Sequence, residues 1–387
     1  MRVLISGGGS GGHIYPALAV ATHLRDHFHA DILYLGSNDG LETQLVPAAG
    51  LRLVTVQAGK LQRYLSWGTL KGVARVPLGM TQALSLVRQF RPDVAFTSGG
   101  YVAVPAGLAA RLNNVPLLMH QQDVPPNLAN RLIAPIATRI SVAFSDSLPF
   151  FPAQKSLLLG NPLRQELLDV RQTAPHEAKQ IVGFLQNLPL VVVTGGSQGA
   201  RHLNQVLCRS LPELLPFCQV LQISGPKLFA ETQSLSTEML QGLSPEVQQR
   251  YRLVPYMSDE MPFALQAADL VICRAGAATL SELALLAKPS ILVPLPPAVG
   301  KSPQEVNAAA FAKKQAALVI KNDALQPLGL VEQVRSVLLS EEQQKMLARA
   351  IATFARENAT QEIVTTLLHM TKGSDAQDLK KQEVIHH

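Results

Sequence analysis

The feature that most constrains the fold of this chain is a strand, a glycine loop and a helix in immediate succession at its start. Residues 2–5 are mostly apolar, as expected of a buried strand, and they run directly into Ser6–His13, a loop of glycine and serine that ends in histidine. Apolar residues at helical spacing follow over 14–24. In open α/β sheets, ligands bind at the carboxyl ends of the strands, where such a loop lies. The unit therefore predicts a phosphate or pyrophosphate site with one imidazole at its edge.

The same unit recurs in the second half of the chain. The apolar run Leu190–Thr194 is followed by Gly195–Ala200 and by a helical pattern over 201–214. Short apolar strands alternate with helices elsewhere, which is typical of doubly wound parallel sheets. Further strands are expected at 31–36, 51–56, 93–97, 115–120, 139–142, 218–223, 251–254, 269–273, 290–293 and 317–320. We therefore predict an α/β fold of two Rossmann-like doubly wound domains with a cleft between them.

The domain boundaries follow from the length and from the prolines. A chain of 387 residues is expected to form two domains, and Pro149, Pro152 and Gly160–Pro162 interrupt the alternation of strands and helices. We expect an N-terminal domain at 1–160 and a C-terminal domain at 161–352. Helical sequence covers 341–370, and its last part, about 353–370, is expected to pack back on the N-terminal domain. The polar residues 371–387 are expected to be disordered. The expected helices of the N-terminal domain are 14–28, 69–91, 103–113 and 126–135.

The composition excludes several classes of protein. The chain has three cysteines, an odd number without metal-ligand spacing, which disfavours a disulfide framework or a metal site and fits a reducing cytoplasm. No stretch approaches the roughly 18 uninterrupted apolar residues that a membrane-spanning helix needs, and no signal-peptide pattern is present. The protein is therefore expected to be soluble or peripheral to a membrane.

The net charge of +6 is unevenly distributed. No acidic residue occurs from Thr43 to Pro92, a stretch that carries seven basic ones. Within it, basic side chains flank aromatic and aliphatic ones, which is typical of a segment that lies in a membrane interface. The alternative is an ordinary amphipathic helix packed on the sheet. We expect the membrane-facing residues to be Lys60, Arg63, Tyr64, Trp67, Lys71 and Arg75.

The opening loop contains the spacing of a dinucleotide site, Gly7-x-Gly9-x-x-Gly12. That kind of site also needs an acidic residue at the end of the second strand, and here this strand ends in Leu35–Asn38. A nicotinamide or flavin cofactor is therefore disfavoured, and we expect no cofactor. A tight turn without a ligand would need fewer glycines. His13 follows the loop, where a neutral imidazole can take a proton from an attacking hydroxyl, and the helix N-terminus should keep it neutral.

Polar residues also follow other strands of both halves. In the first half these are Tyr101, His120, Asp123, Asn127 and Asn130. Since the carboxyl ends of parallel strands share one edge, these side chains are expected to converge on one crevice. In the second half, Gly195–Ala200 is a second anion cradle. Glu282 lies on the helix after Arg274, where a carboxylate can accept from a ribose diol or simply complement the helix dipole. Gln304 and Asn307 share one helix face, suited to sugar hydroxyls.

Taken together, these motifs resemble the MurG family of lipid II-forming N-acetylglucosaminyltransferases, which have the GT-B fold. The matching stretches occur in the family's order over nearly the whole chain. They are Gly7–Pro16, Gly99–Pro105, His120–Asp123, Gly160–Arg164, Gly195–Arg201, Arg274–Glu282 and Gln304–Ala308.

The resemblance implies an inverting transfer of GlcNAc from UDP-GlcNAc to the C4 hydroxyl of MurNAc in lipid I. It implies a peripheral enzyme on the cytoplasmic face of the cell membrane, which meets an anionic membrane surface, with no nucleic-acid partner. The N-terminal domain would bind the acceptor and the C-terminal domain the donor.

The resemblance also implies a role for each matching residue. The donor side would comprise Glu282 at the ribose, Arg274 near the nucleotide, Ser197 and Gln198 at the diphosphate, Gln304 and Asn307 at the GlcNAc, and Arg164 at the hinge. The acceptor side would comprise His13 as base, with Ser10, Gly11, Gly12, Tyr101, His120, Asn127 and Asn130 around it.

Two departures from the family pattern keep alternatives open. The family usually has His-Glu-Gln-Asn where this chain has His120–Asp123, so Asp123 is a second candidate catalytic residue. The loop Lys301–Pro303 also differs from the usual acidic pair and histidine. The alternatives are another lipid-directed or small-molecule glycosyltransferase, a non-hydrolysing UDP-GlcNAc epimerase, and a catalytically silent nucleotide-sugar-binding protein.

Overall fold

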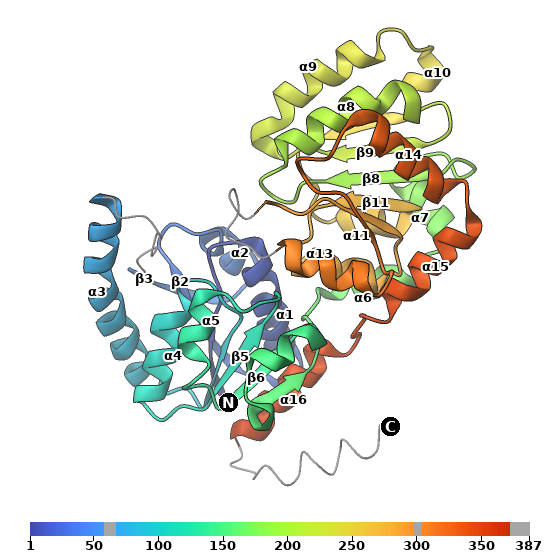
Figure 1. The fold of residues 1–387 in the computed structure, drawn as a ribbon. Helices are drawn as coiled ribbons and strands as arrows, with labels where there is room; N and C mark the ends of the chain where they lie inside the picture. Colours follow the sequence, from blue (N-terminus) through green and yellow to red (C-terminus); the bar gives the residue numbers. More distant parts are fainter. Residues whose placement is uncertain (58–66, 297–303, 372–387) are drawn as a thin grey trace. The chain divides into compact units, whose positions relative to one another are not determined.

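The computed structural model describes residues 1–57, 67–296 and 304–371, and the side chains of 67–77 are outside the description. Within it the chain forms two compact units (Figure 1). The N-terminal unit comprises Met1–Leu163 and the chain from Asn358 onward, and the C-terminal unit comprises Arg164–Glu357. Each unit is built on its own parallel sheet, which confirms the prediction of two Rossmann-like doubly wound domains.

The N-terminal unit has a seven-stranded sheet in the order β3-β2-β1-β4-β5-β6-β7, and its strands pair in parallel. The strands are β1 (Arg2–Ser6), β2 (Asp31–Ser37), β3 (Arg52–Val56), β4 (Val94–Thr97), β5 (Leu117–Gln121), β6 (Arg139–Val142) and β7 (Ser156–Leu158). The helices are α1 (Gly11–Phe28), α2 (Glu42–Ala48), α3 (Trp67–Phe90), α4 (Ala103–Leu112), α5 (Leu128–Ile133) and α16 (Ala359–Thr371), with 3₁₀ turns η1 (Ser145–Phe150) and η2 (Ala153–Lys155).

Helices cover both faces of this sheet. On one face, Ala83 of α3, Ala106 of α4 and Ile133 of α5 pack on alternate strand residues. On the other face, Val20 of α1 and Val364 of α16 share a core cluster with the opposite side chains of the strands. Because both faces are covered, the strands are apolar throughout rather than alternating, as is typical of parallel sheets.

The C-terminal unit repeats the plan with six strands in the order β10-β9-β8-β11-β12-β13. The strands are β8 (Leu190–Thr194), β9 (Gln219–Ile223), β10 (Tyr251–Val254), β11 (Leu270–Cys273), β12 (Ser290–Leu292) and β13 (Leu318–Val319). The helices are α6 (Gln165–Asp169), α7 (Pro175–Ile181), α8 (Arg201–Leu214), α9 (Phe229–Leu240), α10 (Pro245–Gln248), α11 (Met261–Ala267), α12 (Ala277–Leu285), α13 (Gln304–Lys313), α14 (Pro327–Leu338) and α15 (Glu341–Ala352), with 3₁₀ turns η3 (Val170–Gln172) and η4 (Pro226–Leu228).

The C-terminal end of the chain differs from the sequence-based expectation in one respect. The helical stretch expected over 341–370 is two helices, α15 and α16, separated at 353–358. This break carries the chain from one unit to the other, since α15 belongs to the C-terminal unit and α16 packs on α1 of the N-terminal unit (Figure 1).

Among the described residues, no helix is both long and apolar enough to cross a bilayer. The expected membrane-facing residues Lys60, Arg63 and Tyr64 lie outside the described residues, as does the tail 372–387. Trp67, Lys71 and Arg75 fall on the described backbone of α3, but their side chains are outside the description.

Candidate functional site

The predicted loops of the N-terminal unit meet at the topological switch point of its sheet. β1 lies between β2 and β4, so the order of the strands reverses there. The glycine loop follows β1, and Ser98–Tyr101 follows β4. The two loops touch, because Gly8 N donates to Gly99 O at 3.4 Å and Ser98 N donates to Ser6 O at 3.0 Å. Ligands of doubly wound folds bind at such a crevice.

The glycines of the opening loop are explained by the packing of the chain itself. A Cβ at Gly8 would lie 2.6 Å from Glu42 Oε1, and one at Gly9 would lie 2.9 Å from the Tyr101 ring. A Cβ at Gly100 would overlap the carbonyl oxygen of Gly8. Glycine at these three positions is therefore explained without the anion that the sequence suggested. Gly9 and Ser10 are the exposed residues of the loop, and Gly11 and Gly12, in the first turn of α1, are half-buried.

His13 lies in the first turn of α1 and is held from the loop after β4. Its Nδ1 is 3.0 Å from Ser98 O, which can only accept, so Nδ1 carries the proton. The other ring nitrogen, Nε2, then has the lone pair of a base. Ser98 Oγ donates to the carbonyl of His13 and fixes its backbone as well. The structure thus gives His13 the tautomer that proton abstraction requires.

Burial lowers the pKa of His13 below its ordinary value, while Asp123 and the bond to Ser98 act in the opposite direction. The prediction that His13 is neutral agrees with this direction, but the main cause is desolvation rather than the helix N-terminus. Asp123 is partly buried and lies near enough to influence His13 electrostatically. The two candidate catalytic residues therefore belong to one cluster.

Gln122 is a further residue of this cluster, which the sequence did not single out. It is almost fully buried, and its Nε2 donates to Ser98 O at 3.1 Å and lies 3.3 Å from His13 Nδ1. Asn127 caps α5 by accepting from Asn130 N at 2.9 Å. A Cβ at Gly99 would lie 2.9 Å from His13 Nδ1 and 3.5 Å from Asn127 Nδ2, so Asn127 also lies beside the imidazole.

His120 and Asn130 do not line this surface. Both side chains are buried, and His120 bonds Ser141 Oγ at 2.8 Å and Asn161 Oδ1 at 3.0 Å. Asn130 Nδ2 donates to His120 O and to Gln121 Oε1. In this structure the two residues brace β5 and the loop after it, and their expected place on the acceptor side stays a prediction.

The C-terminal unit presents its loops in the same way, after β8 and β11 on either side of its own switch point. Ser197 and Gln198 are exposed in the loop before α8. In contrast to the opening loop, a Cβ at Gly196 or at Gly276 would meet nothing within 4 Å. Gly276 also has an ordinary extended conformation, with φ of −74°. Gly196 has φ of +79°, a left-handed conformation that favours glycine, and Gly276 is the N-cap of α12, while at both positions the space beside the backbone is open among the described residues.

Glu282 is a partly buried carboxylate on α12. Burial raises its pKa to about 7, against an opposing effect of Arg164. Arg274 follows β11, and its Nη1 donates to Val293 O, after β12, at 2.9 Å and to Asn322 Oδ1, after β13, at 2.8 Å. Arg274 thus holds the loops after β11 and β12 together in this structure. Glu282 is the better placed of the two to bind a ligand, since burial removes its carboxylate from solvent and no ion pair holds it within the described residues.

Gln304 and Asn307 at the start of α13 also bind neighbouring backbone. Gln304 Oε1 accepts from Leu295 N at 2.9 Å, and Asn307 is buried with Nδ2 donating to Ala275 O at 3.0 Å. Through this bond Asn307 fixes the loop between β11 and α12, and its expected contact with a sugar stays a prediction. The altered loop Lys301–Pro303 lies outside the described residues.

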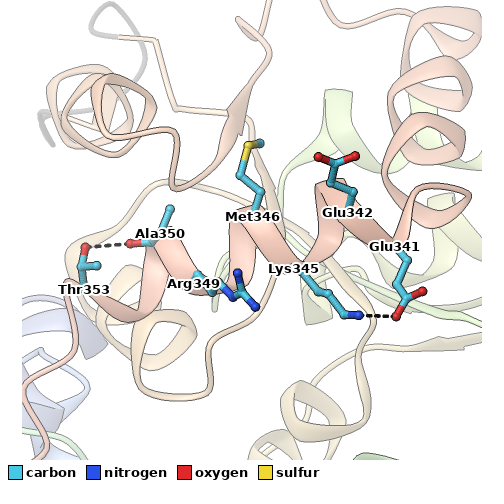
Figure 2. Close-up of a pocket in the computed structure, with 7 residues that line it drawn as sticks. All are labelled: Glu341, Glu342, Lys345, Met346, Arg349, Ala350 and Thr353. Atoms are coloured by element: carbon cyan, nitrogen blue, oxygen red, sulfur yellow. Dashed lines mark hydrogen bonds and ion pairs between the residues drawn. The ribbon is translucent and has the colours of Figure 1, made fainter.

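One cavity lies away from all these residues. It has a volume of about 700 Å³ and follows one side of α15, lined by Glu341, Glu342, Lys345, Met346, Arg349, Ala350 and Thr353 (Figure 2). In Figure 2, Lys345 points to Glu341, four residues earlier on the helix. Its lining residues come from α15 and from Thr353 directly after it, so it lacks the convergent groups of a catalytic site. In the described part of the chain, no three His, Cys, Asp or Glu side chains gather as a metal site would require.

Comparison with known families matches both units. The glycosyltransferase family 28 N-terminal domain matches residues 3–142, and the family 28 C-terminal domain matches residues 190–363. The chain belongs to glycosyltransferase family 28. The two matches together span the strands of both sheets except β7, and the family assignment confirms the resemblance that the motifs indicated.

Curated relatives of this family 28 chain share one name, UDP-N-acetylglucosamine–N-acetylmuramyl-(pentapeptide) pyrophosphoryl-undecaprenol N-acetylglucosamine transferase. The protein of Caldanaerobacter subterraneus subsp. tengcongensis is 39% identical over 343 residues, covering 88% of this chain and 92% of the relative. That of Desulforudis audaxviator is 40% identical over 346 residues, covering 87% and 90%.

Solved structures confirm the GT-B architecture. The crystal structure of Acinetobacter baumannii MurG is similar with a TM-score of 0.72 and 27% identity, covering 95% of this chain and 99% of that one. A UDP-GlcNAc 2-epimerase from Neisseria meningitidis is similar in fold alone, with a TM-score of 0.68 and 14% identity over 95% of this chain and all of that one.

One departure of this family 28 chain from the usual pattern has a structural explanation. Gln121 stands where the family pattern has glutamate, and it is fully buried. Its Nε2 donates to Asp123 O at 2.7 Å, and its Oε1 accepts from Asn130 Nδ2 at 2.7 Å. An ionised carboxylate could not donate to the carbonyl of Asp123, so the amide is the side chain that this arrangement requires.

Proposed function

We propose that this chain transfers GlcNAc from UDP-GlcNAc to the C4 hydroxyl of MurNAc in lipid I, giving lipid II for peptidoglycan synthesis. The observation that carries the proposal is the shared name of relatives that are about two-fifths identical over nearly nine-tenths of the chain. The structure adds an imidazole in the form of a base in the N-terminal unit and open glycine loops in the C-terminal unit.

In this proposal His13 is the general base. Transfer with inversion in a single displacement needs a group that removes the proton of the attacking hydroxyl. Since Nδ1 is committed to Ser98 O, Nε2 receives that proton, and the resulting imidazolium is stabilised by nearby Asp123. Asp123 thus assists the base, and it is the alternative base if His13 proves dispensable.

The donor is proposed to bind the C-terminal unit. UDP leaves with additional negative charge, and the backbone of Gly195–Ala200, which leads into α8, offers amides to that charge. Ser197 and Gln198 are exposed there. Glu282 accepts from the ribose diol, and the missing Cβ atoms at Gly196 and Gly276 let the nucleotide approach the backbone.

The acceptor is lipid-linked, so the N-terminal unit is proposed to contact an anionic membrane surface on the cytoplasmic face. Within the described residues, α5 offers a pair of leucines four positions apart, Leu128 and Leu132, each 51% exposed. Residues at this spacing share one helix face. Arg131, between them in sequence, is exposed and supplies positive charge. Such a face buries leucine among acyl chains while arginine meets anionic headgroups.

Turnover with defined substrates tests the function. Purified protein is incubated with labelled UDP-GlcNAc and a lipid I analogue, beside the His13→Ala variant and a control, His27→Ala, which changes an exposed histidine of the same helix. We expect labelled disaccharide-lipid from the parent and the control, and a rate about 10²–10⁴-fold lower from His13→Ala. Release of ManNAc would indicate an epimerase instead, and donor binding without any turnover would indicate a silent binding protein.

Vesicle co-sedimentation tests the membrane contact. The double variant Leu128→Ser/Leu132→Ser is compared with Leu328→Ser/Leu339→Ser, which changes two leucines of the C-terminal unit that are 72% and 70% exposed. On vesicles that contain anionic lipid, we expect only the α5 variant to bind less than the parent. Equal loss in both, or no loss in the α5 variant, would contradict the assigned face.

A further inference from the structure

A buried carboxylate lies behind the opening loop and has no part in the mechanism above. Glu42 begins α2 and is 0% exposed. Its Oε1 accepts from Ser37 N at 2.9 Å and from Ser37 Oγ at 2.6 Å, while Oε2 accepts from Gly9 N at 3.4 Å. Among the described residues, the donors to this carboxylate are therefore an amide and a hydroxyl from the end of β2 and an amide from the glycine loop.

The surrounding glycines are shaped to this carboxylate. A Cβ at Gly8 would lie 2.6 Å from Glu42 Oε1, and one at Gly36 would lie 2.8 Å from Glu42 Cγ. A Cβ at Gly40 would overlap the carboxylate itself. Removing a carboxylate from water is costly, and it is tolerated when hydrogen bonds satisfy its oxygens. Glycine at positions 8, 36 and 40 therefore makes room for the Glu42 carboxylate.

The hydrogen bonds from this carboxylate extend to Tyr101 with a defined direction. Ser37 has one hydroxyl proton, and since Glu42 as a carboxylate can only accept, this proton points to Glu42. The 2.7 Å bond between Ser37 Oγ and the Tyr101 hydroxyl must then have Tyr101 as its donor. The hydroxyl has a single proton, so the contact of Tyr101 with Asp39 Oδ1, which is longer at 3.4 Å, competes for it, and the 2.7 Å bond to Ser37 is the stronger of the two. The phenol proton is thus turned inward.

We propose that Glu42 is a positioning residue for the acceptor side of the site. It pins the amide of Gly9 in the loop that precedes His13. Through Ser37 it also sets the Tyr101 hydroxyl so that any substrate group bound there must be a donor, such as a sugar hydroxyl or an amide N–H. The nature of the acceptor in this inference rests on the proposed function. The direction of the hydrogen bonds from Tyr101 to Ser37 and from Ser37 to Glu42 does not.

Steady-state kinetics of Glu42→Gln tests the role in acceptor recognition. The glutamine amide has the volume of the carboxyl group but turns an N–H₂ group toward the donors around it. We therefore expect kcat/KM for the lipid I analogue to fall about 10- to 100-fold, which is the effect of losing one hydrogen bond to a charged group. KM for UDP-GlcNAc and its binding affinity should stay within twofold. The matched control is Glu362→Gln, an exposed glutamate on α16. Equal losses for donor and acceptor, or an unchanged acceptor kcat/KM, would overturn the proposal.

A double-mutant cycle separates positioning from general damage to the fold. If Glu42 acts through Tyr101, then Glu42→Gln should lower acceptor kcat/KM much less in a Tyr101→Phe background than in the parent. Ser37→Ala, which cuts the connection but leaves the carboxylate with both backbone amides, should resemble Tyr101→Phe. Fully additive losses would contradict an action through Tyr101.

An NMR measurement that needs no turnover tests this inference separately from the proposed function. In protein with tyrosine ¹³C-labelled at the phenol carbon, the Tyr101 signal is assigned by its loss in Tyr101→Phe. We expect this signal to move in Glu42→Gln and in Ser37→Ala but not in Glu362→Gln. An unmoved signal would refute the hydrogen-bond order, while a moved signal in a protein that transfers no sugar would refute only the proposed function.

Discussion

At the scale of single residues, the sequence identified groups whose local motif is distinctive and missed groups whose role depends on packing. His13 was predictable because a glycine loop and a helix start surround it. Glu42 and Gln122 were not, because their partners Gly9 and Ser98 are distant in sequence and only the sheet brings them together. The bond from Asn307 to the carbonyl of Ala275 was not predictable for the same reason, although the spacing of Asn307 from Gln304 is visible in the sequence.

The pH dependence of turnover follows from the environment of His13. The base acts in its neutral form, and burial places its pKa below 6.5, so kcat should be lost only as the pH falls below 6.5. In Gln122→Glu a carboxylate replaces the amide beside Nδ1, which favours the imidazolium. We expect the acid limb of the pH–rate profile to move to higher pH in this variant. An acid limb at the same pH in both proteins would exclude His13 as the group that titrates.

Glu282 should show a conflict between stability and binding. Its folded-state pKa of about 7 lies above the ordinary 4.5, so folding takes up a proton between these values, and stability falls as the pH rises through this window. Glu282→Gln removes this effect. We expect the variant to gain Tm relative to the parent at pH 8 more than at pH 5, yet to bind UDP-GlcNAc more weakly. Calorimetry at both pH values measures each quantity, with Glu166→Gln, an exposed glutamate on α6, as the control.

At the scale of elements, the alternation of strands and helices was predictable because apolar runs and glycine loops are local signals. The helix 201–214 and the strands 139–142, 190–194 and 251–254 have the predicted bounds. β7 was missed because it is three residues long and lies among prolines that indicated only a boundary. The break between α15 and α16 was missed because both helices continue the same polar and apolar spacing.

The glycine loops of the two units should respond differently to an added methyl group. Gly100 has φ of 85°, and its Cβ would overlap Gly8 O, so Gly100→Ala should destabilise the N-terminal unit by more than about 1–2 kcal/mol. Gly276→Ala meets open space, so it should cost no more than about 1 kcal/mol at this helix N-cap while weakening UDP-GlcNAc binding. Thermal melts and donor titrations of both variants check the contrast. Unchanged donor affinity in Gly276→Ala would remove the steric argument for a ligand at that loop.

At the scale of the whole molecule, the two units share one plan, and the chain returns to the first unit only at its end. Both sheets carry their site loops at the switch point, after β1 and β4 in one and after β8 and β11 in the other. The repetition was visible in the sequence because the glycine loop recurs after a similar strand. The return of α16 to the N-terminal unit completes the core cluster around α1, through Ile363, Val364 and Leu367.

Truncating one α16 side chain should therefore destabilise the N-terminal unit. Leu367 is 0% exposed, and Leu367→Ala is expected to cost about 2–5 kcal/mol. The control Gln361→Ala changes an exposed residue of the same helix and should cost less than about 0.5 kcal/mol. The stability of the N-terminal unit is measured by hydrogen exchange of the α1 amides as denaturant is added. Loss of protection confined to the C-terminal unit would contradict the assignment of α16.

The central claim, an inverting transfer of GlcNAc by a base in the N-terminal unit, is tested most directly by the configuration of the product. UDP-GlcNAc is α-linked, so attack from the opposite face must give a β-linked GlcNAc on the lipid I analogue. The anomeric proton of the isolated disaccharide-lipid, observed by NMR, distinguishes the two linkages. We predict the β-linked product from the parent and a much reduced amount of it from His13→Ala. An α-linked product, or UDP released without transfer of the sugar, would contradict the account.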